Sequence, residues 1–161
     1  MYHALTRRTA LALGGVALAL PVAVLAKTAG KFEVTLTPAQ WKARLTPAAY
    51  AVLREEGTER PFSSKLDGEK RRGTFLCAGC RLPLFASPTK YDSGTGWPSF
   101  YAPIKGAVST SSDRSMMIER IEVHCRRCGG HLGHVFDDGP APTGKRYCMN
   151  GVALSFAPAK V

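Results

Sequence analysis

Downstream of residue 26 the chain has no low-complexity tract, and it has no internal repeat beyond two Cys-x-x-Cys pairs. The composition, with 45% hydrophobic and 21% charged residues, is that of an ordinary globular protein, which excludes the disordered, collagenous and coiled-coil classes. Acidic residues are also scarce, at 12 against 22 Lys and Arg, a net charge of +10. The basic residues nevertheless form no long run and no basic helical repeat. A nucleic-acid partner is therefore not expected, and the excess positive charge indicates a solvated surface.

The first 26 residues have the composition of an export signal. Arg7 and Arg8 precede an apolar stretch over residues 9–25 that ends in small residues before Ala26. A basic start, an apolar centre and a small-residue end predict cleavage after about Ala26 and a periplasmic protein. The Arg pair resembles a twin-arginine signal, although Ala10 stands where an aromatic residue is commonest, so general secretion stays an alternative. An uncleaved membrane anchor is a second alternative.

The remaining 135 residues, 27–161, suit one domain, with its core over about residues 34–158. Thr37-Pro38 and Thr46-Pro47 each predict a helix N-terminus, and Gly57 is expected to stop the second helix. From Phe75 onward short alternating runs lie between Gly, Pro, Asp and Ser residues, at 74–76, 116–124 and 146–156. This pattern predicts a mainly β domain of largely antiparallel strands behind two short helices.

Four of the five cysteines form two identical knuckles, Cys77-Ala78-Gly79-Cys80 and Cys125-Arg126-Arg127-Cys128. Each knuckle can present two thiolates to one tetrahedral ion, so the pairing predicts one structural zinc per chain, with Gly79 and Gly129-Gly130 easing the turns. The 44 residues between the knuckles require a β segment between them, so the metal would join distant parts of the chain. Two local disulfides or one redox-active pair are the alternatives in an exported protein.

The fifth cysteine, Cys148, is a candidate nucleophile. On a strand over 146–156, alternation places Arg146, Cys148 and Asn150 on one face, followed by Val152 and other apolar residues. A cation two residues away would lower the pKa of the thiol and favour the thiolate. A buried structural cysteine is the alternative.

Two further clusters could complete a site. His131 and His134 lie three apart in a Gly-rich stretch, with Asp138 four residues later, and histidine exchanges protons near neutral pH. A second metal pair or ordinary core and turn histidines are the alternatives, and His124 is interpreted as structural. Trp97 lies on a tight turn, where it serves either in packing or as the wall of an apolar pocket.

Taken together, the motifs resemble the methionine-R-sulfoxide reductase B family. The likeness runs in unbroken order from about Phe32 to Phe156. Besides the two knuckles, four segments carry it: Gly57-Thr58-Glu59-Arg60-Pro61-Phe62, Ser93-Gly94-Thr95-Gly96-Trp97-Pro98-Ser99-Phe100, His131-Leu132-Gly133-His134-Val135-Phe136 with Asp138-Gly139-Pro140, and Arg146-Tyr147-Cys148-Met149-Asn150.

The resemblance implies a barrel-like pair of antiparallel sheets with short N-terminal helices, and zinc on the far side from the active site. It implies reduction of the R epimer of methionine sulfoxide in oxidised proteins or peptides. The protein is expected to be a monomer. The resemblance also implies that Cys148 is the nucleophile and that His131 and His134 polarise the sulfoxide. Asn150 and Asp138 would be supporting polar groups, and Arg146 a neighbour that tunes the thiol. Trp97 and Phe136 would contact the substrate.

Two departures from the family pattern stand out. Ser93 and Thr95 occupy a region where some relatives carry a second cysteine, so no thiol is left to resolve an oxidised Cys148. An external thiol, such as a thioredoxin-like protein, is then the expected reductant. Gly151 stands where the family more often has Ser, which affects local hydrogen bonding but not the reaction class.

Two other functions stay open at this point. In a zinc-ribbon-like binding module Cys148 would be incidental, but the histidine and Arg-Tyr-Cys-Met-Asn motifs would then be unexplained. In a thiol-disulfide oxidoreductase one Cys-x-x-Cys pair would be redox-active and little zinc would be bound.

Overall fold

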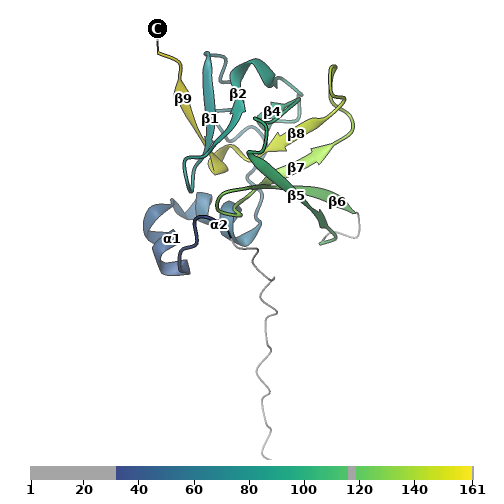
Figure 1. The fold of residues 1–161 in the computed structure, drawn as a ribbon. Coiled ribbons are helices and arrows are strands. Elements are labelled where there is room, and N and C mark those ends of the chain that lie inside the picture. The colour runs from purple at the N-terminus through teal and green to yellow at the C-terminus, as the bar shows by residue number, and fades with distance from the viewer. Residues whose placement is uncertain (1–31, 116–118, 161) are drawn as a thin grey trace, which may run out of the picture.

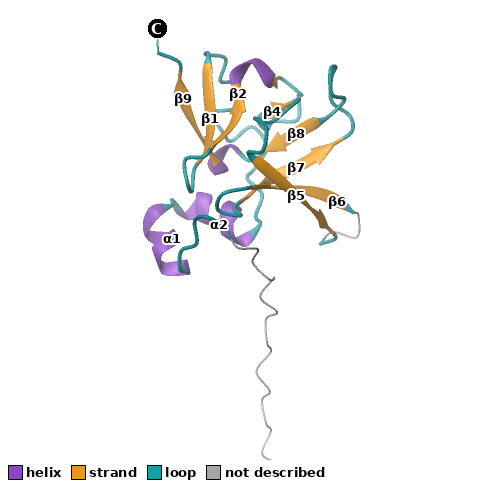
Figure 2. Cartoon of the chain, viewed as in Figure 1, coloured by secondary structure: helices purple, strands orange, loops and turns teal. Residues whose placement is uncertain are grey.

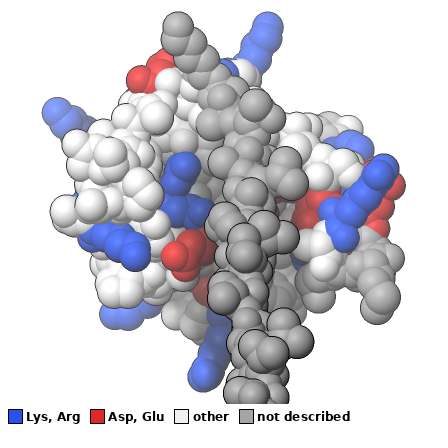
Figure 3. All heavy atoms as spheres, turned by 90° about the horizontal axis from the view of Figure 1, so that it is seen from below, with Lys and Arg blue, Asp and Glu red and all other residues white. Residues whose placement is uncertain are grey.

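The computed structural model describes residues 32–115 and 119–160, which form two antiparallel sheets preceded by two short helices (Figure 1). The expected export signal lies outside the described residues, as does the start of the run expected at 116–124. Within 32–115 and 119–160, no helix has the length and apolar character needed to cross a membrane. Figure 3 shows the face that is seen from below in the view of Figure 1. Among the coloured residues on this face, Lys and Arg side chains are spread singly, with acidic groups among them.

Both expected helices form, and both begin where Thr-Pro predicts. In helix α1 (Pro38–Arg44) the Thr37 hydroxyl accepts the Gln40 amide, and the Gln40 side chain accepts the Thr37 amide. This reciprocal pair satisfies two backbone donors that a helix start leaves unpaired. In helix α2 (Pro47–Glu55) the Thr46 hydroxyl accepts the Ala49 amide, without a reciprocal bond. The expectation that Gly57 stops α2 is wrong by one residue, because Glu56 takes the left-handed conformation at φ 56°.

Within the described ranges, nine strands form a sheet of three and a sheet of six, coloured orange in Figure 2. The small sheet has the order β2-β1-β9: Pro83–Ala86, Gly73–Cys77 and Leu154–Pro158. The large sheet has the order β3-β4-β8-β7-β6-β5: Lys90–Tyr91, Ser99–Phe100, Arg146–Met149, His131–Phe136, Arg120–Cys125 and Val108–Asp113. The mainly β, antiparallel prediction is therefore confirmed, although neither sheet closes into a barrel within the described chain.

The core lies between the two sheets and beneath the helices. Phe75 and Phe85 of the small sheet are fully buried against Phe100 of the large sheet, with ring centroids 4.9 and 4.3 Å from that of Phe100. Aromatic contacts of this kind add to the free energy gained from burial alone. Helix α2 packs on β7 and contributes Val52 and Leu53, which are also buried.

The single strand expected over 146–156 is wrong. Strand β8 ends at Met149, a short 3₁₀ turn (Gly151–Ala153) follows, and the chain then enters β9 of the other sheet. The alternating face therefore stops at Cys148: Val152 lies in the 3₁₀ turn, and the later apolar residues belong to β9 of the small sheet. The physical reason is that this connection joins the two sheets, so the backbone must turn where alternation alone would continue.

Candidate active site and metal centre

A cavity of about 130 Å³ is lined by strands β6, β7 and β8 and by two loops. This volume suits one side chain, since sites for drug-sized ligands occupy about 300–1,000 Å³. Five of the eight lining residues were expected in the site: Trp97, His134, Phe136, Cys148 and Asn150. Three were not singled out from the sequence: Thr58, Arg120 and Gly133.

Cys148 lies on β8, between β4 and β7, and is directly opposite Ser99 and His134 in the two ladders. Burial raises the pKa of its thiol above the ordinary value, while Arg146, Thr95 and Ser99 lower it. Arg146 therefore acts in the expected direction, but the expected net decrease in the pKa is wrong because loss of solvation is the larger effect. The thiol is only partly buried, so a substrate can reach it.

The histidine and cysteine strands approach closely because Gly133 has no side chain. A Cβ at Gly133 would lie 2.1 Å from the carbonyl oxygen of Cys148, and its φ of 154° is unusual for other residues. Only glycine fits this contact. The Gly between the two histidines thus brings β7 against the strand that carries the nucleophile.

Each histidine is paired with its own carboxylate. Nδ1 of His131 lies 3.0 Å from the Glu122 carboxylate, and Nε2 of His134 lies 2.8 Å from that of Asp113. The two rings meet edge to face, with centroids 5.3 Å apart. His131 is buried and does not line the cavity, and its Nε2 has no hydrogen-bond partner among the residues in the described ranges. Both histidines thus have one nitrogen fixed by an acid.

Asn150 is held on both sides. Its side-chain oxygen accepts the Glu59 amide at 2.9 Å and its side-chain nitrogen donates to the Leu132 carbonyl at 3.1 Å. The Glu59 carboxylate in turn accepts the amides of Gly151 and Val152. These bonds tie the loop after helix α2 to the turn behind Cys148, so Asn150 has a fixed orientation at the cavity.

Asp138 does not lie in the cavity. Its carboxylate is 61% exposed and makes two hydrogen bonds to Arg146, at 2.9 and 2.8 Å. The guanidinium of Arg146 also stacks over the Phe136 ring, 4.4 Å from its centroid. Asp138 therefore reaches the site only through Arg146, and the sequence interval of four residues from His134 does not bring it to the thiol.

The loop that carries Trp97 also brings hydroxyl groups close to Cys148. Ser93 lies 2.8 Å from both Thr95 and Ser99, and the Thr95 hydroxyl lies 4.0 Å from the sulfur of Cys148. The indole of Trp97 donates to the Glu59 carbonyl at 3.2 Å, which fixes the ring as a wall of the cavity.

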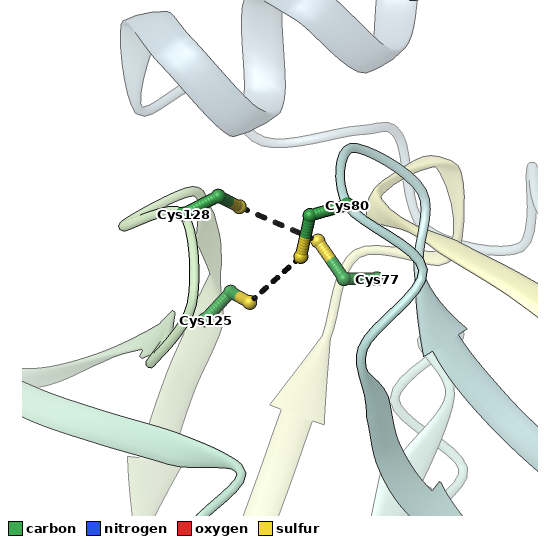
Figure 4. A group of neighbouring side chains, drawn as sticks. All are labelled: Cys77, Cys80, Cys125 and Cys128. Carbon is green, nitrogen blue, oxygen red and sulfur yellow. Dashed lines mark hydrogen bonds between the residues drawn. The ribbon is translucent and has the colours of Figure 1, made fainter. Parts of the chain in front are cut away.

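The other four cysteines form one cluster, with their sulfur atoms all within 4.8 Å of one another (Figure 4). The close distances run between the knuckles, 3.7 Å from Cys77 to Cys128 and 3.5 Å from Cys80 to Cys125. A tetrahedral zinc with Zn–S bonds of about 2.3 Å needs sulfurs about 3.8 Å apart, so these residues fit the ion. All five cysteines are free thiols, so neither local disulfides nor an oxidised pair is formed.

The two knuckles are built alike, although only one uses glycine. The amide of Gly129 donates to the Cys125 carbonyl, and the amide of Arg81 donates to the Cys77 carbonyl, both at 2.8 Å. These closing residues have φ values of 65° and 63°. The expectation that Gly79 supplies the turn is wrong, because Arg81 takes the left-handed conformation instead. That conformation is costly for a residue with a Cβ.

The acids behind the histidines were missed because nothing in the sequence marks them. Asp113 is 21 residues before His134 and Glu122 is nine residues before His131, and both are joined to them only by strand pairing. Glu59 and Thr58 were inside a quoted motif, which was the available signal for them.

Comparison with known proteins agrees with the motifs. A SelR domain matches residues 45–158. A peptide methionine sulfoxide reductase MsrB of Methanosarcina barkeri is 58% identical over 118 residues, covering 73% of this chain and 83% of its own. Proteins of the same name from Leptospira interrogans and Pseudomonas putida are 52% and 54% identical, covering 78% of this chain and 96% of theirs. The cavity, the cysteine cluster and these likenesses agree, and the chain belongs to the SelR-domain family of MsrB peptide methionine sulfoxide reductases.

Proposed function

We propose that this protein reduces the R epimer of methionine sulfoxide in oxidised peptides and proteins. The observation that carries the proposal is that Cys148, His134, Asn150 and Trp97 line one cavity the size of a side chain, in a member of the MsrB family. The family name supplies the substrate class, and the cavity supplies a nucleophile and a proton donor for it.

The reaction transfers one oxygen atom to the enzyme. The Cys148 thiolate attacks the sulfoxide sulfur to form an S–S bond, and the S–O bond breaks as its oxygen gains two protons and leaves as water. That water then attacks the Cys148 sulfur and loses a proton, and the S–S bond breaks as methionine leaves with the electron pair. The products are methionine and a Cys148 sulfenic acid, so the sulfoxide is reduced by two electrons and the thiol is oxidised by two.

His134 supplies the acid for this step, because it lines the cavity and lies directly opposite Cys148 in the ladder. The buried ring of His131 assists from beside it, with the two ring centroids 5.3 Å apart. Asn150 orients the sulfoxide oxygen, and the Trp97 ring faces the methyl group. Arg146 favours the thiolate against the effect of burial, with Asp138 and Phe136 holding its guanidinium.

An external thiol completes the cycle. The chain has five cysteines, four of which form the metal cluster, and the residues nearest the Cys148 sulfur carry hydroxyl groups. A first thiol condenses with the sulfenic acid to give a mixed disulfide and water. A second thiol then releases free Cys148. Mass spectrometry of peroxide-treated protein tests this cycle, since an internal disulfide that includes Cys148 would contradict it.

The four clustered thiolates hold one zinc ion per chain. Four sulfur ligands close the tetrahedral shell and leave no position for a substrate, so the ion stabilises the fold. Its four ligands come from two turns separated by 44 residues of sequence: Cys77, Cys80, Cys125 and Cys128.

Residues 1–26 direct export to the periplasm, with cleavage after about Ala26. The basic pair, the apolar stretch and the small residues before Ala26 support this proposal. N-terminal sequencing of the protein recovered from a periplasmic extract tests it. A mature protein that still begins at Met1 would favour a membrane anchor.

Separate assays of the R and S epimers of a peptide-like methionine sulfoxide, with dithiothreitol as reductant, test the reaction. We expect turnover of the R epimer alone, and none with Cys148→Ser. Zinc-loaded, folded protein that reduces neither epimer would refute the reductase and favour the zinc-ribbon-like binding module.

A further inference from the structure

Three ionisable side chains on neighbouring strands form a chain of contacts at the cavity. His134 of β7 lies 2.8 Å from a carboxylate oxygen of Asp113 at the end of β5, and Arg120 of β6 donates to the same oxygen at 2.7 Å. The three side chains are largely buried, with 10%, 18% and 26% of their surfaces exposed. The other Asp113 oxygen accepts the Ser115 amide at 2.9 Å, so the carboxylate has one fixed position.

We propose that Asp113 is a positioning residue that keeps a proton on Nε2 of His134 and leaves Nδ1 as the nitrogen that meets the substrate. A carboxylate accepts hydrogen bonds and donates none when ionised, so the nitrogen beside it must carry a proton. The side chain of His134 lines the cavity of Cys148, and its remaining nitrogen is the one available there. This inference rests on the proposed reductase function, because only that reaction requires the imidazole to deliver a proton.

Asp113 stays ionised under the conditions of the reaction. Hydrogen bonds from Ser115, His134 and Arg120 hold the pKa of its carboxyl well below its usual range. The bond to a charged acceptor is stronger than a neutral one and therefore restrains the ring. A similar use of carboxylates to fix a histidine tautomer occurs behind metal-binding and catalytic histidines.

Some of the groups around His134 disfavour its charged form, whereas Asp113 favours it. Burial, Arg120 of β6 and His131 of β7 all lower the pKa of His134, and Asp113 raises it. Glu122 lies across the ladder, but its carboxylate bonds to His131, and Cys148 faces His134 from β8. Loss of the Asp113 charge therefore leaves His134 harder to protonate.

The expected effect on rate follows from the need for an imidazolium and a thiolate at once. The active form of the enzyme has His134 protonated and Cys148 deprotonated. At a pH between the low pKa of His134 and the high pKa of Cys148, the fraction of molecules in this form falls about tenfold for each unit by which the His134 pKa drops. Asp113→Asn should therefore lower turnover about tenfold or more. It should also move the low-pH limb of the profile to lower pH.

Nitrogen NMR of the wild-type protein reads the tautomer directly and needs no variant. We expect neutral His134 to carry its proton on Nε2, with the resonance assigned by its loss in His134→Gln. In Asp113→Asn, which keeps an oxygen for the Ser115 amide, we expect the His134 pKa to fall. The rate of Cys148 alkylation by iodoacetamide should stay the same, because the thiol is not in contact with Asp113.

Asp137→Asn is the matched control, since this exposed acid pairs with Lys145 and is expected to leave the tautomer, the pKa and turnover unchanged. A wild-type His134 protonated on Nδ1, or an unchanged His134 pKa in Asp113→Asn, would overturn the proposal. Wild-type protein that reduces neither epimer would refute the reductase function instead, and the NMR measurement would still decide the role of Asp113.

Discussion

Gly151 follows the site residue Asn150, and the structure explains why it lacks the side chain that the family pattern favours. A Cβ at this position would lie 1.9 Å from the hydroxyl oxygen of Ser64 and 2.3 Å from its Cβ. The backbone conformation at Gly151 is not left-handed, so the conflict is one of space alone. We therefore predict that Gly151→Ser is destabilising only because Ser64 already fills the volume.

The size of the effect follows from overpacking of a tight site. Extra atoms forced into well-packed structure cost about 1–3 kcal/mol, since neither the Ser64 Cβ nor the backbone can move freely. A loss of this size lowers the melting temperature by about 4 °C per kcal/mol in a domain of this length. Ser64→Gly alone loses the hydrogen bond from the Leu66 amide, worth about 1 kcal/mol, but removes both clashing atoms.

A double-mutant cycle by urea denaturation measures the coupling between the two positions. In the Ser64→Gly background, Gly151→Ser should be nearly neutral, giving a coupling of about 1–3 kcal/mol. Ser64→Ala is the control that keeps the Cβ and should rescue the stability only in part. Additive losses in the cycle would show that Ser64 is not the obstacle and would refute this account of Gly151.

Three further predictions concern the metal, the knuckles and the thiol. Removal of zinc by a chelator should lower the unfolding temperature by more than 10 °C, because structural zinc contributes about 10–16 kcal/mol in small domains; an unchanged calorimetric transition would argue against a structural ion. Gly129→Ala should lower the free energy of unfolding by at least about 1–2 kcal/mol, because its Cβ would lie 2.3 Å from the Phe32 ring. Arg81→Gly should leave the free energy of unfolding unchanged or raise it by up to about 1 kcal/mol, because glycine takes the left-handed conformation without strain. The opposite order in urea denaturation would contradict the description of the two turns. Arg146→Met should raise the pKa of the Cys148 thiol further. Because the thiolate fraction falls about tenfold per pKa unit, alkylation by iodoacetamide at pH 8 should slow several-fold. An unchanged alkylation rate would show that Arg146 does not lower the pKa of Cys148.

Local chemistry made several features readable from the sequence. Thr37-Pro38 and Thr46-Pro47 marked both helix starts, since a Thr cap and a Pro in the first turn act over a few residues. The two Cys-x-x-Cys pairs predicted the metal cluster, because the spacing within each pair lets it present two sulfurs to one shared ion. The motif around Cys148 indicated the cavity in the same way, and its neighbour Asn150 was found there.

Other features depend on contacts between residues far apart in the chain. Pairing of β5, β6 and β7 places Asp113 and Glu122 against the two histidines, and no spacing rule reveals such contacts. The pKa of Cys148 is likewise raised by burial within the folded site, although Arg146, two residues away in the chain, lowers it. The break after Met149 arises because the chain there passes from one sheet to the other. The sequence by itself determined which groups carry the chemistry, since motifs are local. Only the tertiary structure decided the pKa values of these groups and the carboxylates that hydrogen-bond them, because burial and strand pairing exist only in the folded chain.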